Sequence, residues 1–410
     1  MAGSTIDHLI SVTVFLGAIL LFISLFNQTI QTAILYQQHE SLATKAGNLL
    51  DNMLLSPGIP VNWGQTNVTP TGFGLQDPEF TQYRLSPFSL MRLRSSVGAP
   101  VYYSKTGLYY SNITMGFGNF LLVPYSKAMN YSTAGRLLGT NGSYGFQLTI
   151  SPVVTVSIKE TQAKSPLKIS VSVTGTGFPL SNAVVTYSFL TVSLSGGGTF
   201  PSYSAKYGSA NTDETGSVLF TFPEVTDENT CYSFIAYAHM AGLIGVGYHE
   251  RETSTQQYII PFVDDFSTRK VLIAHSYDVH YFGPPEAEVS FNATFILLTE
   301  AFTLREMPMD NSTTGKTGKV NYGVGKPYAT ITIPTYNPGI LVITYKKSAQ
   351  EGGIVMMPWG LDPMAFPVVF GDNPFGKEWV TTDIRQVVVD GIAYQAKLAL
   401  WSLGGYKVIG

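Results

Sequence analysis

The first part of the chain is a long apolar run whose pattern predicts a helix. Leu9 to Phe26 contains no charged residue, and a run of this length suits a transmembrane helix better than the shorter apolar core of a signal peptide. No proline interrupts the residues that follow, so the helix can continue to Leu55, where Ser-Pro-Gly at 56–58 ends it. The expected helix from Asp7 to Leu55 is about 70 Å long at about 1.5 Å per residue.

The second half of this helix is amphipathic. Leu35, Leu42 and Leu49 recur at intervals of seven, and Ala46 and Met53 follow the last two by four positions. This spacing places all five on one helical face. A helix that continues beyond a membrane in this way is expected to pack against the protein's own folded domains or against neighbouring copies.

Beyond the helix, residues 57–149 form a mixed α+β block that would lie next to the membrane. Ser86-Pro87 has the composition of a helix N-terminus, and a second short helix is expected to end at Gly139. Residues 150–257 alternate apolar and polar positions in short runs separated by turn signals. This pattern predicts an antiparallel, Ig-like β-sandwich.

Residues 258–410 are again rich in strand patterns. Asp390-Gly391 lies between two apolar runs and predicts a β-hairpin, with a helix over Ala393–Leu403 as the competing interpretation. The expected fold class is therefore mainly β with one long N-terminal α-helix, residues 1–56. A transmembrane and amphipathic helix would be followed by β-sandwich modules.

Composition narrows the class of protein further. Only 12% of the residues are charged and the net charge is -3, so the chain has no basic field that would attract nucleic acid. Cys231 is the single cysteine, which excludes an intramolecular disulfide. We expect Cys231 to be a small buried side chain rather than a reactive thiol.

The start of the chain resembles the N-terminal signature of archaeal type IV pilin-like surface proteins, which carry a class III signal peptide. In the stretch GSTIDHLIS, Gly3 corresponds to the last residue of the leader, Ser4 to the first residue after processing, and Asp7 to the acid of the signature. The resemblance implies that Asp7 pairs with the new N-terminus of a neighbouring subunit. The leader departs from the family because it lacks Lys and Arg. An uncleaved membrane anchor without a filament role is the alternative.

The N-terminal helix is expected to serve both membrane insertion and assembly. Small side chains at Gly17 and Ala18 would allow close helix approach. The residues of this membrane and assembly helix are Asp7, Leu9, Phe15, Gly17, Ala18, Leu21, Phe26, Leu35, Leu42 and Leu49.

Glycosylation sequons favour an extracellular position for the residues after the helix. Six asparagines head N-x-S/T triplets in polar, turn-rich surroundings. The alternative is that such triplets occur there by chance. A further sequon at Asn27 is too close to the lipid to be modified. The candidate acceptors of N-linked glycans are Asn67, Asn112, Asn130, Asn141, Asn292 and Asn311.

Histidines offer the strongest hint of a metal site, and it is a weak one. If HSYDVH were a strand, Asp278 and His280 would share one face and His275 would lie on the other. His239 or His249 from the middle block could then complete a site. We favour ordinary polar positions for all of them.

Other chemistry is sparse. Asp213 and Glu214, followed by Gly216, resemble part of a calcium loop, but a hairpin turn stabilised by its own acid is the better interpretation. The chain contains no HExxH, GxSxG, P-loop or dinucleotide-binding motif. We therefore expect no enzymatic activity, no cofactor and no metal.

The expected function is that of a structural subunit or membrane anchor of an archaeal surface assembly, such as a pilus-like filament. Its partners would be copies of itself or related pilin-like subunits, together with the membrane and N-linked glycans. Its location would be the cell membrane with an extracellular C-terminal part, or an extracellular filament. The alternatives are a solitary membrane-anchored adhesin and, third, a surface enzyme.

Overall fold

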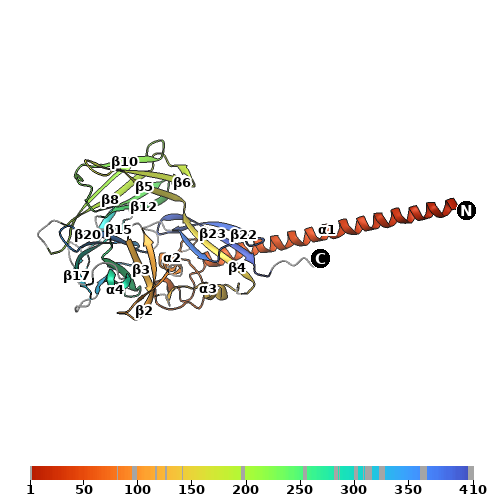
Figure 1. The fold of residues 1–410 in the computed structure, drawn as a ribbon, viewed down its shortest axis with the longest axis horizontal. Helices are drawn as coiled ribbons and strands as arrows, with labels where there is room; N and C mark the ends of the chain where they lie inside the picture. Colours follow the sequence, from red (N-terminus) through yellow and green to blue (C-terminus); the bar gives the residue numbers. More distant parts are fainter. Residues whose placement is uncertain are drawn as a thin grey trace.

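One long helix, α1 (Ala2–Leu55), projects from a body of β-sheets, which confirms the expected fold class (Figure 1). The computed structural model describes residues 2–80, 82–94, 99–115, 118–124, 127–140, 142–194, 199–252, 256–280, 285, 287–299, 303–307, 309, 316–322, 328–360 and 367–404.

The C-terminal part of α1 is part of the core of the body. Leu42, Ala46, Leu49 and Met53 are buried, as the sevenfold spacing predicts, and Leu35 is half-buried. This face packs against a sheet with strand order β21-β4-β23-β22. The strands of this sheet are β4 (Tyr144–Pro152), β21 (Val368–Gly371), β22 (Thr381–Val389) and β23 (Ile392–Ser402).

The middle of the chain forms the predicted antiparallel sandwich. One sheet has the order β10-β6-β5, with β7 paired to β6, and the other has the order β12-β11-β8-β9. Its strands are β5 (Val154–Gln162), β6 (Leu167–Gly175), β7 (Phe178–Pro179), β8 (Val184–Ser193), β9 (Ser202–Asn211), β10 (Ser217–Phe222), β11 (Tyr232–Met240) and β12 (Leu243–Arg251).

Glycines allow the two sheets to meet closely along one side of the sandwich. A Cβ atom added to Gly245 of β12 would lie 2.6 Å from Val154 Cγ1 of β5, and one added to Gly247 would lie 2.6 Å from the Val156 carbonyl oxygen. Larger residues at these two positions would force β12 away from β5.

The remaining strands build two further sheets, and both are antiparallel apart from a short parallel pairing of β3 with β13. One sheet has the order β1-β2-β3-β13-β14-β18, and the other has the order β16-β15-β19-β20 with β17 beside β15. The strands are β1 (Ala99–Tyr103), β2 (Leu108–Met115), β3 (Gly118–Pro124), β13 (Ile259–Asp265), β14 (Lys270–His275), β15 (Glu288–Leu298), β16 (Leu304–Met307), β17 (Lys316–Asn321), β18 (Tyr328–Thr332), β19 (Gly339–Lys346) and β20 (Gly352–Trp359).

This pairing corrects the expected division of the chain. Residues 57–149 and 258–410 do not form separate modules, because β3 pairs with β13 and β4 pairs with both β21 and β23. The two segments share sheets and a continuous core. The sandwich is inserted between them.

Strand β11 of the β12-β11-β8-β9 sheet is buried on both faces. Phe234 and Ala236 of β11 lie in the sandwich interior, whereas Ile235 and Tyr237 lie in the main core of the body. Ser233 Oγ donates a hydrogen bond to Met356 Sδ of β20 at 3.0 Å, which places β20 against the outer face of this sheet. The sandwich is therefore fused to the body through one of its own sheets.

Several short elements follow the local sequence signals. Ser86 Oγ accepts a hydrogen bond from the Ser89 amide at the start of α2 (Pro87–Arg94), and α3 (Tyr131–Leu137) is followed by Gly139 at φ 67°. A short 3-10 helix, η1 (Trp63–Gln65), packs near α2.

The predicted terminal hairpin is confirmed, whereas the strand assumed for the HSYDVH segment is wrong. Asp390 and Gly391 have φ values of 46° and 88° and connect β22 to β23, so the competing helix over Ala393–Leu403 is wrong. Residues Ser276–His280 form the helix α4, not the strand that the metal-site interpretation assumed. Ser276 and Val279 are buried on one side of this turn, and their spacing of three is helical rather than alternating.

Candidate functional site

The candidate site is the part of α1 that lies outside the body. From Ile6 onward the helix is long and apolar enough to cross a membrane, and its most apolar window has a mean hydropathy of 2.7 with no residue buried. Leu9, Phe15, Leu21 and Phe26 are between 57% and 69% exposed. The described body therefore leaves a continuous apolar surface around this helix.

The small and acidic positions of the predicted membrane and assembly helix are open as well. An added Cβ atom at Gly17 would meet no atom within 4 Å. Ala18 and Asp7 are exposed, and Gly3 and Ser4 belong to the first turns of the same helix. The structure thus places the predicted assembly residues on one rod, with all of them from Asp7 to Phe26 accessible.

Three threonine hydroxyls on this rod are satisfied within the helix itself. Thr13, Thr29 and Thr32 each donate a hydrogen bond of 2.8 Å to the carbonyl oxygen four residues earlier. Side-chain hydroxyls bonded in this way do not require water and are compatible with an apolar environment. The surface therefore suits lipid or another helix.

Residues 27–41 extend the rod beyond the most apolar segment. They span about 22 Å at about 1.5 Å per residue and carry a single acidic residue, Glu40. Ile30, Ile34 and Tyr36 are exposed there, and a shallow hollow runs along the helix from Leu25 to Tyr36. An isolated helix of this length is only marginally stable in water.

The buried end of α1 is held by a polar network in addition to its apolar stripe. Arg385 of β22 donates to Asp51 of α1 through Nε at 2.9 Å and through Nη2 at 3.2 Å, and to Asp383 through Nη1 at 2.7 Å. Tyr83 donates its hydroxyl hydrogen to Asp51 at 3.2 Å. The hydrogen bond to Asp51, followed by that to Asp383, raises the pKa of Arg385.

Asp51 and Arg385 are not among the site residues expected from the sequence. A usable signal exists in β22, where Asp383 and Arg385 share a strand face with the buried Val387 and Val389. Charged residues on the buried face of a strand indicate a specific partner. Leu42 and Leu49, expected among the residues of the membrane and assembly helix, are buried against the body instead and are not available to another subunit.

The sequon asparagines differ widely in accessibility. Asn130 is exposed at the N-cap of α3, where its Oδ1 accepts a hydrogen bond of 2.7 Å from the Thr133 amide. Asn67 donates from Nδ2 to Asp265 at 2.7 Å, and Asn112 is half-buried in β2. Asn141 and Asn311 lie outside the described residues.

Asn292 is corrected as a glycosylation candidate. It is 7% exposed in β15, which is paired on both sides, and its Nδ2 donates to the Pro201 carbonyl at 3.4 Å. A glycan on this nitrogen would have to enter the interior of the protein.

The residues that suggested metal binding do not converge. Within the described ranges, no group of three or more His, Cys, Asp or Glu side chains could hold an ion. Burial lowers the pKa of both His275 and His280. In the suspected calcium loop, Asp213 Oδ1 instead accepts hydrogen bonds from the amides of Thr215 and Ser217 at 2.8 and 3.0 Å, as expected for a turn.

Comparisons with known proteins leave the family open. No family model and no curated protein matches the chain. Similar solved structures include trypsin-activated α-2-macroglobulin from Escherichia coli, with a TM-score of 0.21, 9% identity and coverage of 68% of this chain and 20% of that one. Red sea bream transglutaminase has a TM-score of 0.19, 9% identity and coverage of 62% and 37%. This chain thus spans well under half the length of either.

Proposed function

We propose that this protein is a structural subunit or membrane anchor of an archaeal, pilin-like surface assembly, and that it associates with its own copies through α1. The observation that carries the proposal is the length of helix left uncovered. A bilayer requires about 20 apolar residues, yet no residue of α1 from Ile6 to Ser41 is buried, and only Leu35 and Gln38 are half-buried.

The uncovered surface past the most apolar segment supports association rather than simple anchoring. Ile30, Ile34 and Tyr36 would remain in water in a solitary protein whose bilayer segment is Asp7–Phe26. Neighbouring helices would bury these side chains and also stabilise a helix segment that is marginal by itself. Gly17 has no side chain and its surface is uncovered, so two helices could approach closely there.

Asp7 provides the polar part of the proposed contact. In a helix bundle, a carboxylate at the start of an apolar segment requires a partner, and the N-terminus of a neighbouring subunit is the partner that the pilin-like resemblance implies. In a solitary anchor, the same carboxylate would stay hydrated at the membrane surface and contribute little.

The proposal is tested by measuring the mass of full-length protein in mild detergent with size-exclusion chromatography and light scattering. We expect an oligomer for the wild type. Gly17→Leu should dissociate it by blocking close approach. Asp7→Asn should do the same, because removal of one member of a desolvated charge pair costs about 3–5 kcal/mol.

Val12→Phe is the matched control for Gly17→Leu. It adds as many carbon atoms at an exposed position, but about 140° around the helix from Gly17 and about 120° from Ala18, at about 100° per residue, and should leave the oligomer intact. A monomeric wild type, or assembly that survives both Gly17→Leu and Asp7→Asn, would overturn the proposal. A solitary membrane-anchored binding protein would then replace it.

A further inference from the structure

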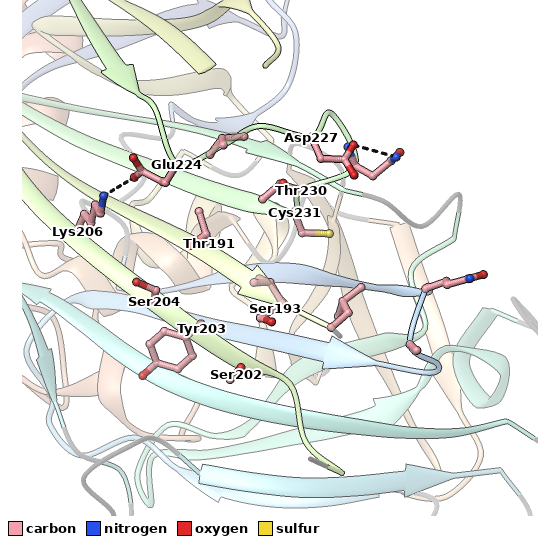
Figure 2. A pocket seen from close by; sticks show the side chains of 16 residues that line it. Thr191, Ser193, Ser202, Tyr203, Ser204, Lys206, Glu224, Asp227, Thr230 and Cys231 are labelled. Carbon is pink, nitrogen blue, oxygen red and sulfur yellow. Dashed lines mark hydrogen bonds and ion pairs between the residues drawn. The ribbon is translucent and has the colours of Figure 1, made fainter. Parts of the chain in front are cut away.

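An open cleft lies beside the β8–β9 pair of the sandwich (Figure 2). It is at the end of the sandwich remote from the junction with β4. β5 starts at this junction, at Val154, and its nine residues carry the sandwich about 30 Å away from it. The cleft has a volume of about 880 Å³ and lies between the β8–β9 pair, the loop from Glu224 to Cys231, and the turn at Ala349–Gln350. Cavities of this size are typical of small-molecule sites.

The floor of the cleft is a ladder of hydroxyl groups. Thr191 of β8 is paired across the sheet with Ser204 of β9, and Ser193 is paired with Ser202. Residues two apart on a strand, and residues directly opposite each other, share one face. These four side chains therefore continue the inner face that carries Phe189 deeper in the sandwich. The face changes from aromatic to hydroxyl where the sandwich opens.

These hydroxyls are available to a ligand. Within the part of the chain that the structure describes, the side chains of Thr191, Ser193, Ser202 and Ser204 make no hydrogen bond to another protein group. Asn229 and Gln350 add amide groups at the rim. Hydroxyls and amides both donate and accept, so the cleft offers paired donors and acceptors over a short distance.

The charged groups around the cleft are already paired. Lys206, the single cationic side chain among its described lining residues, lies 2.6 Å from Glu224. Asp227 accepts hydrogen bonds from the Asn229 amide at 2.9 Å and from Asn229 Nδ2 at 3.1 Å. Among the described lining residues, no cation is therefore left free for a phosphate or a carboxylate.

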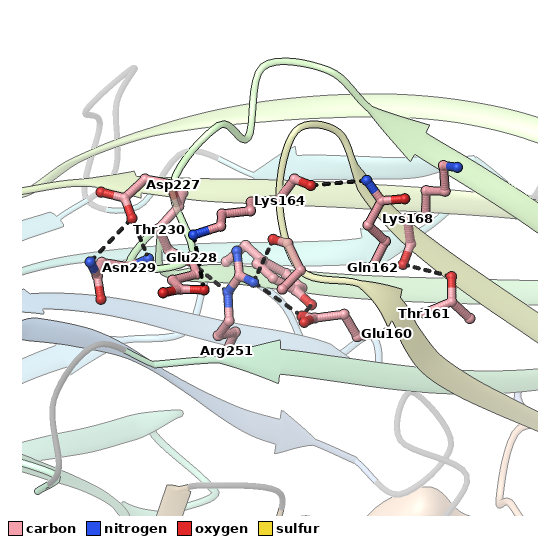
Figure 3. Close-up of polar contacts among 12 residues, drawn as sticks. Glu160, Thr161, Gln162, Lys164, Lys168, Asp227, Glu228, Asn229, Thr230 and Arg251 are labelled. Carbon is pink, nitrogen blue, oxygen red and sulfur yellow. Dashed lines mark hydrogen bonds and ion pairs between the residues drawn. The ribbon is translucent and has the colours of Figure 1, made fainter.

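The loop from Glu224 to Cys231, which borders the cleft, is held by polar contacts to neighbouring strands and loops (Figure 3). Arg251 of β12 donates from Nε to the Thr230 carbonyl at 3.1 Å and from Nη1 to Glu160 at 3.3 Å. Lys164 pairs with Glu228 at 3.2 Å. A loop held in this way loses little conformational freedom when a ligand binds, which favours affinity.

We propose that this cleft binds a neutral saccharide. A sugar presents many hydroxyls that donate and accept in turn, and it requires neither a counter-charge nor an apolar pocket. The lining of the cleft is about as polar as it is apolar, which suits a sugar better than a lipid chain. This inference goes beyond the proposed assembly through α1 and does not depend on it, because no residue of α1 lines the cleft.

The test uses the full-length protein in a zwitterionic detergent, because maltoside head groups would compete for the site. Maltotriose, mannotriose and chitotriose serve as neutral probes, and sialyllactose serves as a charged one. Saturation-transfer NMR identifies binding, and calorimetry gives the affinity. We expect at least one neutral trisaccharide to bind with a Kd in the millimolar range or lower. Sialyllactose should bind no more tightly than the neutral sugars.

Variants then locate the site. Ser204→Phe fills the floor and should abolish binding, while Ser209→Phe places the same side chain at an exposed position elsewhere on β9 and should not. Thr191→Val keeps the shape, removes one hydroxyl and should weaken binding about tenfold. Thermal melting of each variant monitors folding, and Thr191→Val carries the test if Ser204→Phe does not fold.

The proposal fails if none of the neutral probes binds, or if Ser204→Phe and Thr191→Val bind as the wild type does. It also fails if sialyllactose binds in preference to the neutral sugars. Oligomer mass should be unchanged in both cleft variants, and saccharide binding should be unchanged by Gly17→Leu. Failure of this proposal is thereby separated from failure of the proposed assembly.

Discussion

Arg385 of β22 and Asp51 of α1 form a bidentate ion pair although they lie 334 positions apart in the sequence. The guanidinium contacts both carboxylate oxygens and also Asp383. Two parallel hydrogen bonds fix the direction of a side chain as well as its distance. The pair therefore sets the rotation of α1 on the sheet, which the apolar stripe alone leaves less defined.

Arg385→Lys should loosen this attachment, because a lysine ammonium cannot contact both oxygens in the same geometry. Since the two side chains are 28% and 36% exposed, we expect a loss of about 1 kcal/mol in unfolding free energy. Hydrogen exchange at residues 42–54 should become faster in the variant. Lys397→Arg on neighbouring β23 is a control for a cation exchanged elsewhere on this sheet, and equal exchange in Arg385→Lys and the wild type would contradict the assignment.

Glu252 predicts an unusual pH dependence of stability. Burial raises its pKa well above the ordinary value, although its Oε1 accepts a hydrogen bond of 2.7 Å from the Ile354 amide. The folded state therefore keeps a proton that the unfolded chain releases above about pH 4.5. This group's contribution is fully favourable below that pH, and stability falls as the pH rises from there toward the folded-state pKa.

Glu252→Gln should remove this pH dependence. The variant keeps the shape and the acceptor for Ile354, so we expect it to be more stable than the wild type by about 1–3 kcal/mol at pH 7–8. The two proteins should have similar stability near pH 4. Chemical unfolding monitored across this pH range gives the comparison, and a constant difference at every pH would show that Glu252 is ionised in the folded protein.

The sandwich is expected to be unstable when it is separated from the body. Residues 150–257 expressed alone would expose Leu190, Ile235, Tyr237 and Val246, which the intact chain buries in the main core. We expect the fragment to self-associate and to bind a hydrophobic dye. Ile235→Thr together with Val246→Thr should reduce both effects. A fragment that is monomeric and melts cooperatively without these changes would show that the sandwich folds independently.

Glycan occupancy should follow the accessibility of the sequons. Asn130 should be modified in protein isolated from its native membranes, because its Nδ2 is free to carry a sugar while Oδ1 caps α3. Asn292 should be unmodified because it is buried in β15. Glycopeptide mass spectrometry reads both sites in one sample, and a sugar on Asn292 would mean that this part of the sheet differs in the native protein.

Local patterns were sufficient for the features whose stability is local. The sevenfold spacing at Leu42 and Leu49 predicted a buried helical face, and Asp390-Gly391 predicted a hairpin, because a helix or a two-residue turn depends on neighbouring residues. The same spacing could not say what covers the face. The structure shows that it is the protein's own β22 and β23.

Features that depend on distant contacts could not be predicted in this way. β4 pairs with β23 and β3 pairs with β13, and nothing in either strand's own sequence specifies a partner so far along the chain. Asn292 was expected at the surface because of its N-x-T triplet, but β17 and β19 cover its strand on both edges. The cleft at Thr191 and Ser204 is likewise formed only when β8 and β9 pair.

Because α1 is unbroken, the rotation of the body about the helix axis is fixed relative to the apolar N-terminal segment. Between Phe26 and Leu42 the helix contains neither glycine nor proline, and Arg385 holds the C-terminal end of the helix. The body therefore cannot rotate independently of the N-terminal part of α1. Each residue of helix corresponds to about 100° of rotation. One inserted alanine in this stretch would therefore rotate the proposed saccharide cleft by about 100° around the helix axis, whereas seven would return it to within about 20° of its original direction. The number of residues in the stalk, and not only their polarity, therefore determines which side of the sandwich each copy presents to its surroundings.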